Sequence, residues 1–170
     1  MVDATLLVRH LESNETIPLR DVHAAMESNN LLVLGLLREV VTRHPNRIFP
    51  KPDWMDCRRA IVTYLLLCVE QKPELDEYVL SPYLAMHDLL GMMRHWQLQP
   101  GEEQTLVPET LERLRQLYLR GSAETQLCIE NGFLEHFLED RNNLSLLGRW
   151  KTDPQTATAI QESLKWSEGT

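Results

Sequence analysis

The chain has 170 residues, of which 43% are apolar, and its 25 acidic residues outnumber its 17 Lys and Arg residues, giving a formal net charge of −8. A chain of this length and composition buries enough apolar surface to fold without disulfides or structural metal ions, so we expect residues 1–170 to form a single domain rather than a disordered chain. The acidic balance argues against a nucleic-acid partner, because duplex binding requires a basic surface.

Several features bear on the cellular compartment. No apolar run reaches the roughly 20 residues that a membrane-spanning helix needs, so we expect no membrane span. The segment from Met1 to Leu11 lacks the basic start, the longer apolar stretch and the small-residue cleavage site of a signal peptide. Cys57, Cys68 and Cys128 form neither an even set nor a close pair, which argues against a disulfide framework and against a zinc site. These features predict a cytoplasmic protein with reduced thiols.

Helical periodicity dominates the chain. Leu19, Val22 and Met26, for example, recur at the spacing of one helix face. Capping residues, prolines and glycines mark the ends of about six to seven such segments. The predicted helices cover residues 19–26, 31–44, 54–68, 82–100, 108–120, 122–138 and 154–166. Strand-like alternation never exceeds a few residues, and no fixed period relates one helix to another. The sequence therefore predicts an all-α fold, and a single irregular bundle rather than a repeat array.

Two local features predict how particular segments pack. The segment from Pro45 to Pro52 holds three prolines, which favours a rigid, extended surface loop that presents Phe49. Gly132 lies inside the helix predicted over 122–138, where glycine costs about 1 kcal/mol relative to alanine. We therefore expect a neighbouring helix to approach closely at Gly132.

The sequence contains few candidates for catalysis. No nucleophile-elbow, phosphate-loop, dinucleotide-binding, zinc-protease or EF-hand motif occurs in it. His23 and Glu27 share a helix face, but two ligands do not make a metal site. Cys57 lies on an apolar stripe without a base nearby in the sequence, which favours a core thiol over a nucleophile. We expect no enzymatic activity, no cofactor and no metal.

Acidic residues gather in three stretches of the sequence, of which the first surrounds Pro73. A concentrated negative field steers a basic partner and raises its association rate. Together with the lack of catalytic motifs, this pattern favours a binding protein. The predicted partner-binding residues are Glu135, His136, Glu139 and Asp140, followed by Glu102 and Glu103.

The run from Gly121 to Asp140, which contains NGFLEHFLED, is followed by Leu147 and a C-terminal helix ending at Trp166. This pattern, which covers about the last 50 residues, resembles small bacterial all-α immunity proteins of polymorphic toxin systems. The resemblance implies a cytoplasmic protein that binds one cognate toxin and neutralises it by occluding its active site. It transfers no catalytic residue, and the negative charge would suit a basic nuclease as the toxin.

Two other functions are compatible with the sequence. A secretion chaperone or adaptor that cradles an apolar effector helix would need an exposed apolar groove, for which Ile48, Phe49 and Trp96 are the candidates. A helical enzyme would need a metal near His23 or His136. The sequence leaves the oligomeric state open.

Overall fold

A computed structural model of the chain describes residues 4–168, except for residues 14, 75 and 100. Met1, at the start of the segment compared with a signal peptide, lies outside the described residues. The structure confirms the predicted all-α class, because helices packed as a bundle account for most of the described chain. In the described part, strands occur only as one parallel pair of two residues each, β1 (Ile17–Pro18) and β2 (Ile48–Phe49).

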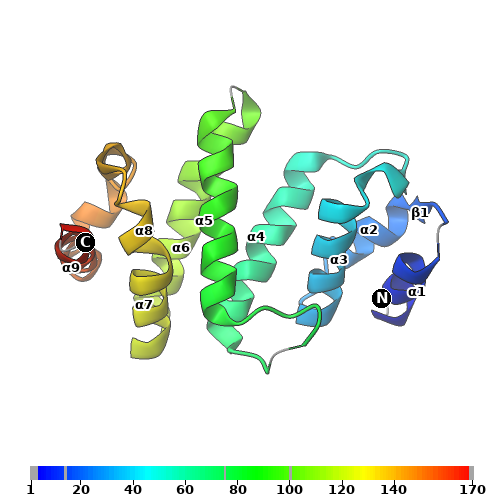
Figure 1. Ribbon diagram of the computed structural model, residues 1–170, viewed down its shortest axis with the longest axis horizontal. Coiled ribbons are helices and arrows are strands. Elements are labelled where there is room, and N and C mark those ends of the chain that lie inside the picture. Colours follow the sequence, from blue (N-terminus) through cyan, green and yellow to red (C-terminus); the bar gives the residue numbers. More distant parts are fainter. Residues whose placement is uncertain (1–3, 14, 75, 100, 169–170) are drawn as a thin grey trace.

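The helices follow one another along the long axis of the molecule, with α1 and α9 at opposite ends (Figure 1). Each packs mainly on helices that are near it in sequence, as α4 does on α3 and α5. The α-helices are α1 (Ala4–Glu12), α2 (Leu19–Met26), α3 (Leu31–Arg43), α4 (Trp54–Gln71), α5 (Pro82–Leu98), α6 (Leu106–Arg120), α7 (Ala123–Ile129), α8 (Glu135–Phe137) and α9 (Pro154–Glu168). The shorter helical turns are η1 (Pro45–Arg47), η2 (Glu102–Thr105), η3 (Glu130–Leu134), η4 (Arg141–Ser145) and η5 (Arg149–Thr152).

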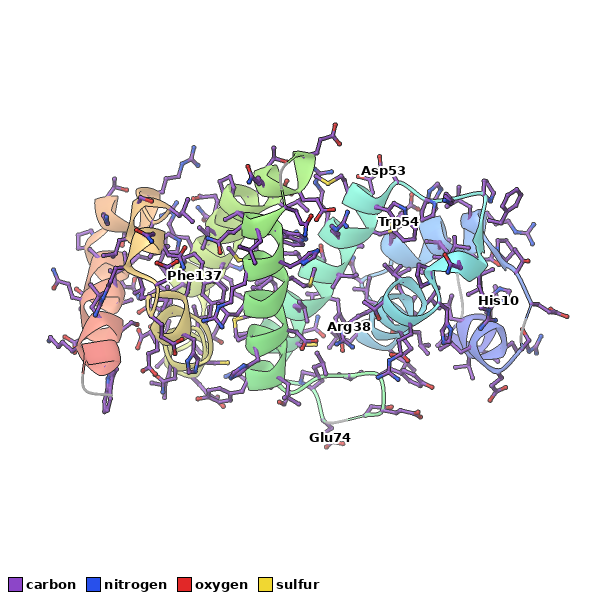
Figure 2. The ribbon with its side chains drawn as sticks, turned by 45° about the horizontal axis from the view of Figure 1, so that its top comes forward. His10, Arg38, Asp53, Trp54, Glu74 and Phe137 are labelled. Atoms are coloured by element: carbon purple, nitrogen blue, oxygen red, sulfur yellow. The ribbon has the colours of Figure 1, made fainter. Side chains whose placement is uncertain are left out.

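Buried hydrophobic side chains form one cluster that extends from Leu7 on α1 to Ile160 on α9. Complete burial of a large apolar side chain contributes roughly 1.5 to 3 kcal/mol, so this cluster is the main source of stability. His10 and Phe137 lie toward the two ends of the molecule in Figure 2, and Phe137 is fully buried. Within the described ranges, no helix combines the length and the apolarity of a membrane span.

Local signals in the sequence set the helix starts. The side chains of Asn30, Asp53, Ser81 and Ser122 each accept backbone hydrogen bonds from the first turn of the helix that follows, as an N-cap does. The predicted helices begin at or next to these four residues, because an N-cap depends only on residues close to it in the chain.

Two helix boundaries differ from the prediction around the turn between α5 and α6. Helix α5 ends at Leu98, and Pro100, its predicted stop, lies outside the described residues. Helix α6 begins at Leu106 rather than Pro108, directly after the 3₁₀ turn η2. A proline without a backbone donor is tolerated anywhere in the first turn of a helix, so Pro108 did not mark the first residue.

Helix α1 was not predicted. It is short, and its place depends on contacts with residues distant in the sequence. Leu7 is fully buried. The Arg47 guanidinium donates hydrogen bonds to the backbone carbonyl oxygens of His10 and Ser13 at the end of α1. The imidazole Nε2 of His10 also lies 3.1 Å from Oδ2 of Asp21 on α2.

The helix predicted over 122–138 is interrupted by a π-helical turn, η3, between α7 and α8. A Cβ added at Gly132 in this turn would lie 3.0 Å from the Cβ of Met86 on α5. The predicted close approach of a neighbouring helix at Gly132 is therefore confirmed. A π turn takes up one more residue than an α turn, so the side chains that follow, including His136, are rotated relative to a regular helix.

Candidate functional site

Four polar side chains from α5 and from the end of α8 form a cluster, which we call the His136 cluster: His87, Arg94, His136 and Glu139. Nδ1 of His136 lies 2.8 Å from Oε1 of Glu139. Nη2 of Arg94 lies 3.2 Å from Oε2 of Glu139 and donates a 2.8 Å hydrogen bond to the carbonyl oxygen of His136. The ring centroids of His87 and His136 are 5.3 Å apart. His136 and Glu139 were predicted as site residues, whereas Arg94 and His87 were not.

The contacts of Glu139 determine its charge state. The hydrogen bond with His136 lowers the pKa of the Glu139 carboxyl, and the nearby Arg94 charge lowers it further. Glu139 is therefore a carboxylate at neutral pH, but Arg94 compensates its charge. Among the described residues, neither Glu135 nor Asp140 has a cationic partner. The predicted acidic surface is thus one of mixed charge, in which Glu135 and Asp140 carry the uncompensated part.

The second predicted acidic segment, Glu102 and Glu103, lies in the turn η2. Oε1 of Glu103 lies 2.6 Å from Nη2 of Arg58 on α4, and its Oε2 is buried without a hydrogen-bond partner in the described structure. Glu102 is exposed. Across the described residues, no hydrogen bond or ion pair joins either glutamate to the His136 cluster. The two predicted patches are therefore separate features of the fold.

A cleft of about 680 Å³ lies between the end of α5, the start of α6 and the η4 turn. We call it the α5–η4 cleft. It includes Arg94 of the His136 cluster and the predicted site residue Asp140. Two large apolar side chains in its lining are exposed, Leu98 to 81% and Leu146 to 41%. The lining consists of Arg94, Gln97, Leu98, Gln104, Val107, Pro108, Asp140, Asn142, Asn143, Ser145 and Leu146.

A hydrogen-bond network fixes one side of this cleft. Asn143, which is only 6% exposed, donates through Nδ2 to the Phe137 carbonyl oxygen at 2.7 Å and accepts from Gln97 Nε2 at 2.7 Å. Asp140 caps η4 by accepting a 3.0 Å hydrogen bond from the Asn142 backbone N–H. Buried amides held in such a network are rigid. The cleft is therefore preformed, which reduces the entropic cost of binding.

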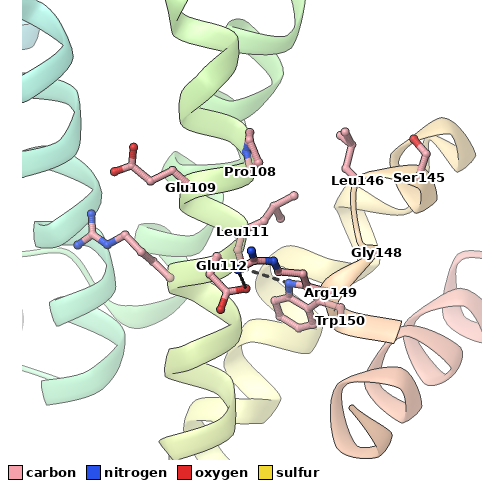
Figure 3. A pocket seen from close by; sticks show the side chains of 10 residues that line it. Pro108, Glu109, Leu111, Glu112, Ser145, Leu146, Gly148, Arg149 and Trp150 are labelled. Carbon is pink, nitrogen blue, oxygen red and sulfur yellow. Dashed lines mark hydrogen bonds and ion pairs between the residues drawn. The ribbon is translucent and has the colours of Figure 1, made fainter. Parts of the chain in front are cut away.

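A second hollow of about 600 Å³ adjoins the cleft and shares Pro108, Ser145 and Leu146 with it (Figure 3). The indole N–H of Trp150 donates a 3.1 Å hydrogen bond to the Leu111 carbonyl oxygen and thereby anchors η5 to α6. Both hollows therefore lie beside the start of α6.

The structure places the other candidate residues apart from this groove. His23 of α2 and Glu27, the residue after that helix, line a separate shallow hollow. Among the described residues, no three His, Cys, Asp or Glu side chains are grouped to hold a metal ion. Cys57 is fully buried, as predicted for a core thiol. Burial raises its pKa to about 11, with further contributions from the charges of Asp53 and Asp56.

The apolar groove predicted for a chaperone does not form at Ile48, Phe49 and Trp96. Ile48 and Trp96 are each only 2% exposed, because Ile48 pairs with Ile17 inside the molecule and Trp96 belongs to the buried stripe of α5. Phe49 alone is exposed, at 71%, so the prediction that its loop presents it is confirmed. The prediction was therefore wrong for Ile48 and Trp96 as exposed residues. Trp96 lines a separate hollow with Trp54, Ile61 and Met92, and an exposed apolar cleft lies at Leu98 and Leu146.

Comparisons with known families, with characterised proteins and with solved structures gave no match to this chain.

Proposed function

We propose that the protein binds another protein through the α5–η4 cleft and the adjoining His136 cluster. The observation that supports this most is the exposure of Leu98 and Leu146 within a preformed cleft whose margins are polar. Protein interfaces combine an apolar centre with a polar rim, and exposed apolar side chains rimmed by polar residues mark interaction sites.

We further propose that the bound protein is a cognate toxin, that binding occludes its active site, and that this takes place in the cytoplasm of the producing cell. The resemblance of residues 121–140 to immunity proteins supports this, because part of that segment forms the His136 cluster and the margin of the cleft. Such a protein acts by stoichiometric blocking and needs no catalytic residue of its own.

We expect the ionic residues at the margin of the cleft to affect the rate of association more than the affinity. Exposed charges at the margin of an interface mainly set the association rate and the orientation of the partner, and contribute little to affinity. Reversing Glu139 alone is therefore expected to cost about 1 kcal/mol of binding free energy. The double variant Arg94→Glu with Glu139→Arg exchanges the two partners of the ion pair and keeps the local net charge. It is the control that separates a loss of binding caused by unfolding from one caused by the change in charge.

The test begins with capture of the partner from a lysate of the source organism. The captured protein is then assayed for toxic activity with and without one equivalent of the purified chain. Suppression by the wild-type chain and by Phe49→Asp, but not by Leu98→Asp, is the expected result, because Phe49 is largely exposed, like Leu98, but lies outside the cleft. A stable complex in which the partner keeps its full activity would contradict the immunity role.

A secretion chaperone or adaptor is the second candidate, and the 81% exposure of Leu98 beside Leu146 is the observation that favours it. An adaptor and an immunity protein would use the same cleft, but they differ in their effect on the partner. An adaptor keeps its partner soluble and leaves its activity intact, so the activity assay distinguishes the two functions.

A further inference from the structure

We propose that the α5–η4 cleft receives an extended segment of the partner, with an apolar side chain between Leu98 and Leu146 and a Lys or Arg beside Asp140. The inference rests on the proposed protein-binding function and adds the chemistry of the partner. Three properties of the cleft support it: its apolar contacts, its amide side chains and its uncompensated charge.

The apolar contacts are local. Leu98 comes from the last turn of α5 and Leu146 from the residue after η4, while Val107 and Pro108 of α6 lie in the wall of the same cleft. These four side chains can contact one apolar side chain of a partner. They do not form the long stripe that the face of an amphipathic helix requires.

The amide side chains favour an extended occupant. A helix satisfies its backbone N–H and C=O groups internally, whereas an extended segment presents them for pairing. Gln97, Gln104, Asn142 and Asn143 all line the cleft. Within the described structure, the side-chain amides of Gln104 and Asn142 make no hydrogen bond, so each retains both a donor and an acceptor for a peptide backbone.

The uncompensated charge in the cleft is negative. Arg94 is already bound to Glu139 and to the His136 carbonyl oxygen. Asp140 accepts one backbone hydrogen bond from Asn142 and, among the described residues, forms no ion pair with a cation. An opposite charge on the partner would complete this site, which is the reason for assigning a Lys or Arg there.

The second hollow adjoins the cleft. It shares Pro108 and Leu146 with the cleft and is shown in Figure 3. An extended chain advances about 3.3 Å per residue, so a few further residues of the partner segment could reach from the cleft toward this hollow.

The experiment selects peptides from a random library displayed on phage, using the full chain as bait. The expected consensus is an apolar residue next to Lys or Arg, without the three-and-four spacing of a helix. For a synthetic peptide of that consensus, Leu98→Asp should weaken binding by about tenfold or more, while Phe49→Asp leaves it unchanged. Selection on Asp140→Lys should enrich Asp or Glu at the position of the Lys or Arg.

Thermal unfolding checks that each variant is folded. Leu98 and Phe49 are both largely exposed, so their replacement by Asp should not disturb the core. The proposal is overturned by a failure to enrich any peptide, by helical spacing or acidic residues in the consensus, or by equal binding to Leu98→Asp. These results are separable from the test of the proposed function. A toxin still inhibited by Leu98→Asp removes the cleft as the binding site but leaves the immunity role, whereas a confirmed consensus with an uninhibited partner removes only the immunity role.

Discussion

Nδ1 of His136 lies 2.8 Å from Oε1 of Glu139, and Arg94 from α5 binds the other oxygen of the same carboxylate. This carboxylate therefore connects the end of α8 to α5 at the edge of the α5–η4 cleft. The arrangement fixes the margin on which the proposed partner would rest.

Replacing His136 with phenylalanine should raise the pKa of Glu139 toward its usual value, because a hydrogen bond to the ionised carboxylate is what chiefly lowers it. Titration of the Glu139 carboxyl carbon by NMR measures this directly. His23→Phe serves as a control, since His23 lies on α2 and has no contact with Glu139. A Glu139 pKa that is the same in His136→Phe and in the wild type would show that the pair is not formed in solution.

Gly35 should not tolerate any side chain. A Cβ at this position of α3 would lie 1.9 Å from the carbonyl oxygen of Tyr78, in the loop between α4 and α5. Gly35→Ala is expected to destabilise the fold by about 3 kcal/mol or more, because the clash is with backbone. Gly91→Ala on α5, where a Cβ meets no atom within 4 Å, should instead stabilise it by up to about 1 kcal/mol. Urea unfolding of both variants measures the difference, and equal stability would refute the packing of this loop on α3.

Glu112 should make stability depend on pH in the acid range. Its bidentate pairing with Arg115, at 2.9 and 3.0 Å, lowers its pKa from 4.5 to about 2, with help from Gln116. A carboxyl whose pKa is lower in the folded state contributes stability that is complete above pH 4.5 and is lost as the pH falls toward 2.

Glu112→Gln should therefore be less stable than the wild type by about 1 kcal/mol at neutral pH, allowing for solvent screening. This difference in the free energy of unfolding should disappear as the pH falls toward 2. Urea unfolding between these pH values is the measurement, and Glu162→Gln on α9 is the control for an exposed ion pair. A gap that does not change with pH would contradict the assigned pairing.

Thiol reagents should react slowly with the folded protein. All three cysteines are buried, and burial raises the pKa of Cys57 and of Cys128 to about 11. Few thiolates are present near neutral pH, and the sulfur atoms are not accessible. Labelling with a chromogenic disulfide should proceed fully only in denaturant. Rapid labelling of any cysteine under native conditions would point to a reactive thiol that this account does not include.

The helices could be predicted from the sequence because their signals are local. The caps at Asn30 and Asp53 and the apolar periodicity depend on residues within a few positions. Helix α1 could not be predicted in this way, since what holds its end is Arg47, more than thirty residues further along the chain. The two-residue strands are equally non-local, because Ile17 pairs with Ile48.

The candidate site was only partly predictable, for the same reason. His136 and Glu139 are one turn apart, so their pairing follows from spacing. Arg94 belongs to another helix, and its contribution depends on how α5 packs against η3. Gly132 was the sequence signal of that packing, but a glycine does not reveal which residues of the neighbouring helix it faces.

The apolar part of the site was missed because Leu98 and Leu146 lie outside every periodic stripe. Leu98 is the last residue of α5, and Leu146 follows η4 between one exposed and one buried position. A leucine at the end of a helix, within a polar stretch, could have indicated this surface, because such a residue has no apolar neighbours in the sequence with which to form a buried face.

The affinity of the captured partner for four forms of the chain tests the central claim most directly. Isothermal titration would compare the wild type with Leu98→Asp, Leu146→Asp and Phe49→Asp. The account predicts that both cleft variants bind at least about tenfold more weakly, while Phe49→Asp binds like the wild type. Equal affinity in all four forms, or a loss confined to Phe49→Asp, would contradict binding at the α5–η4 cleft.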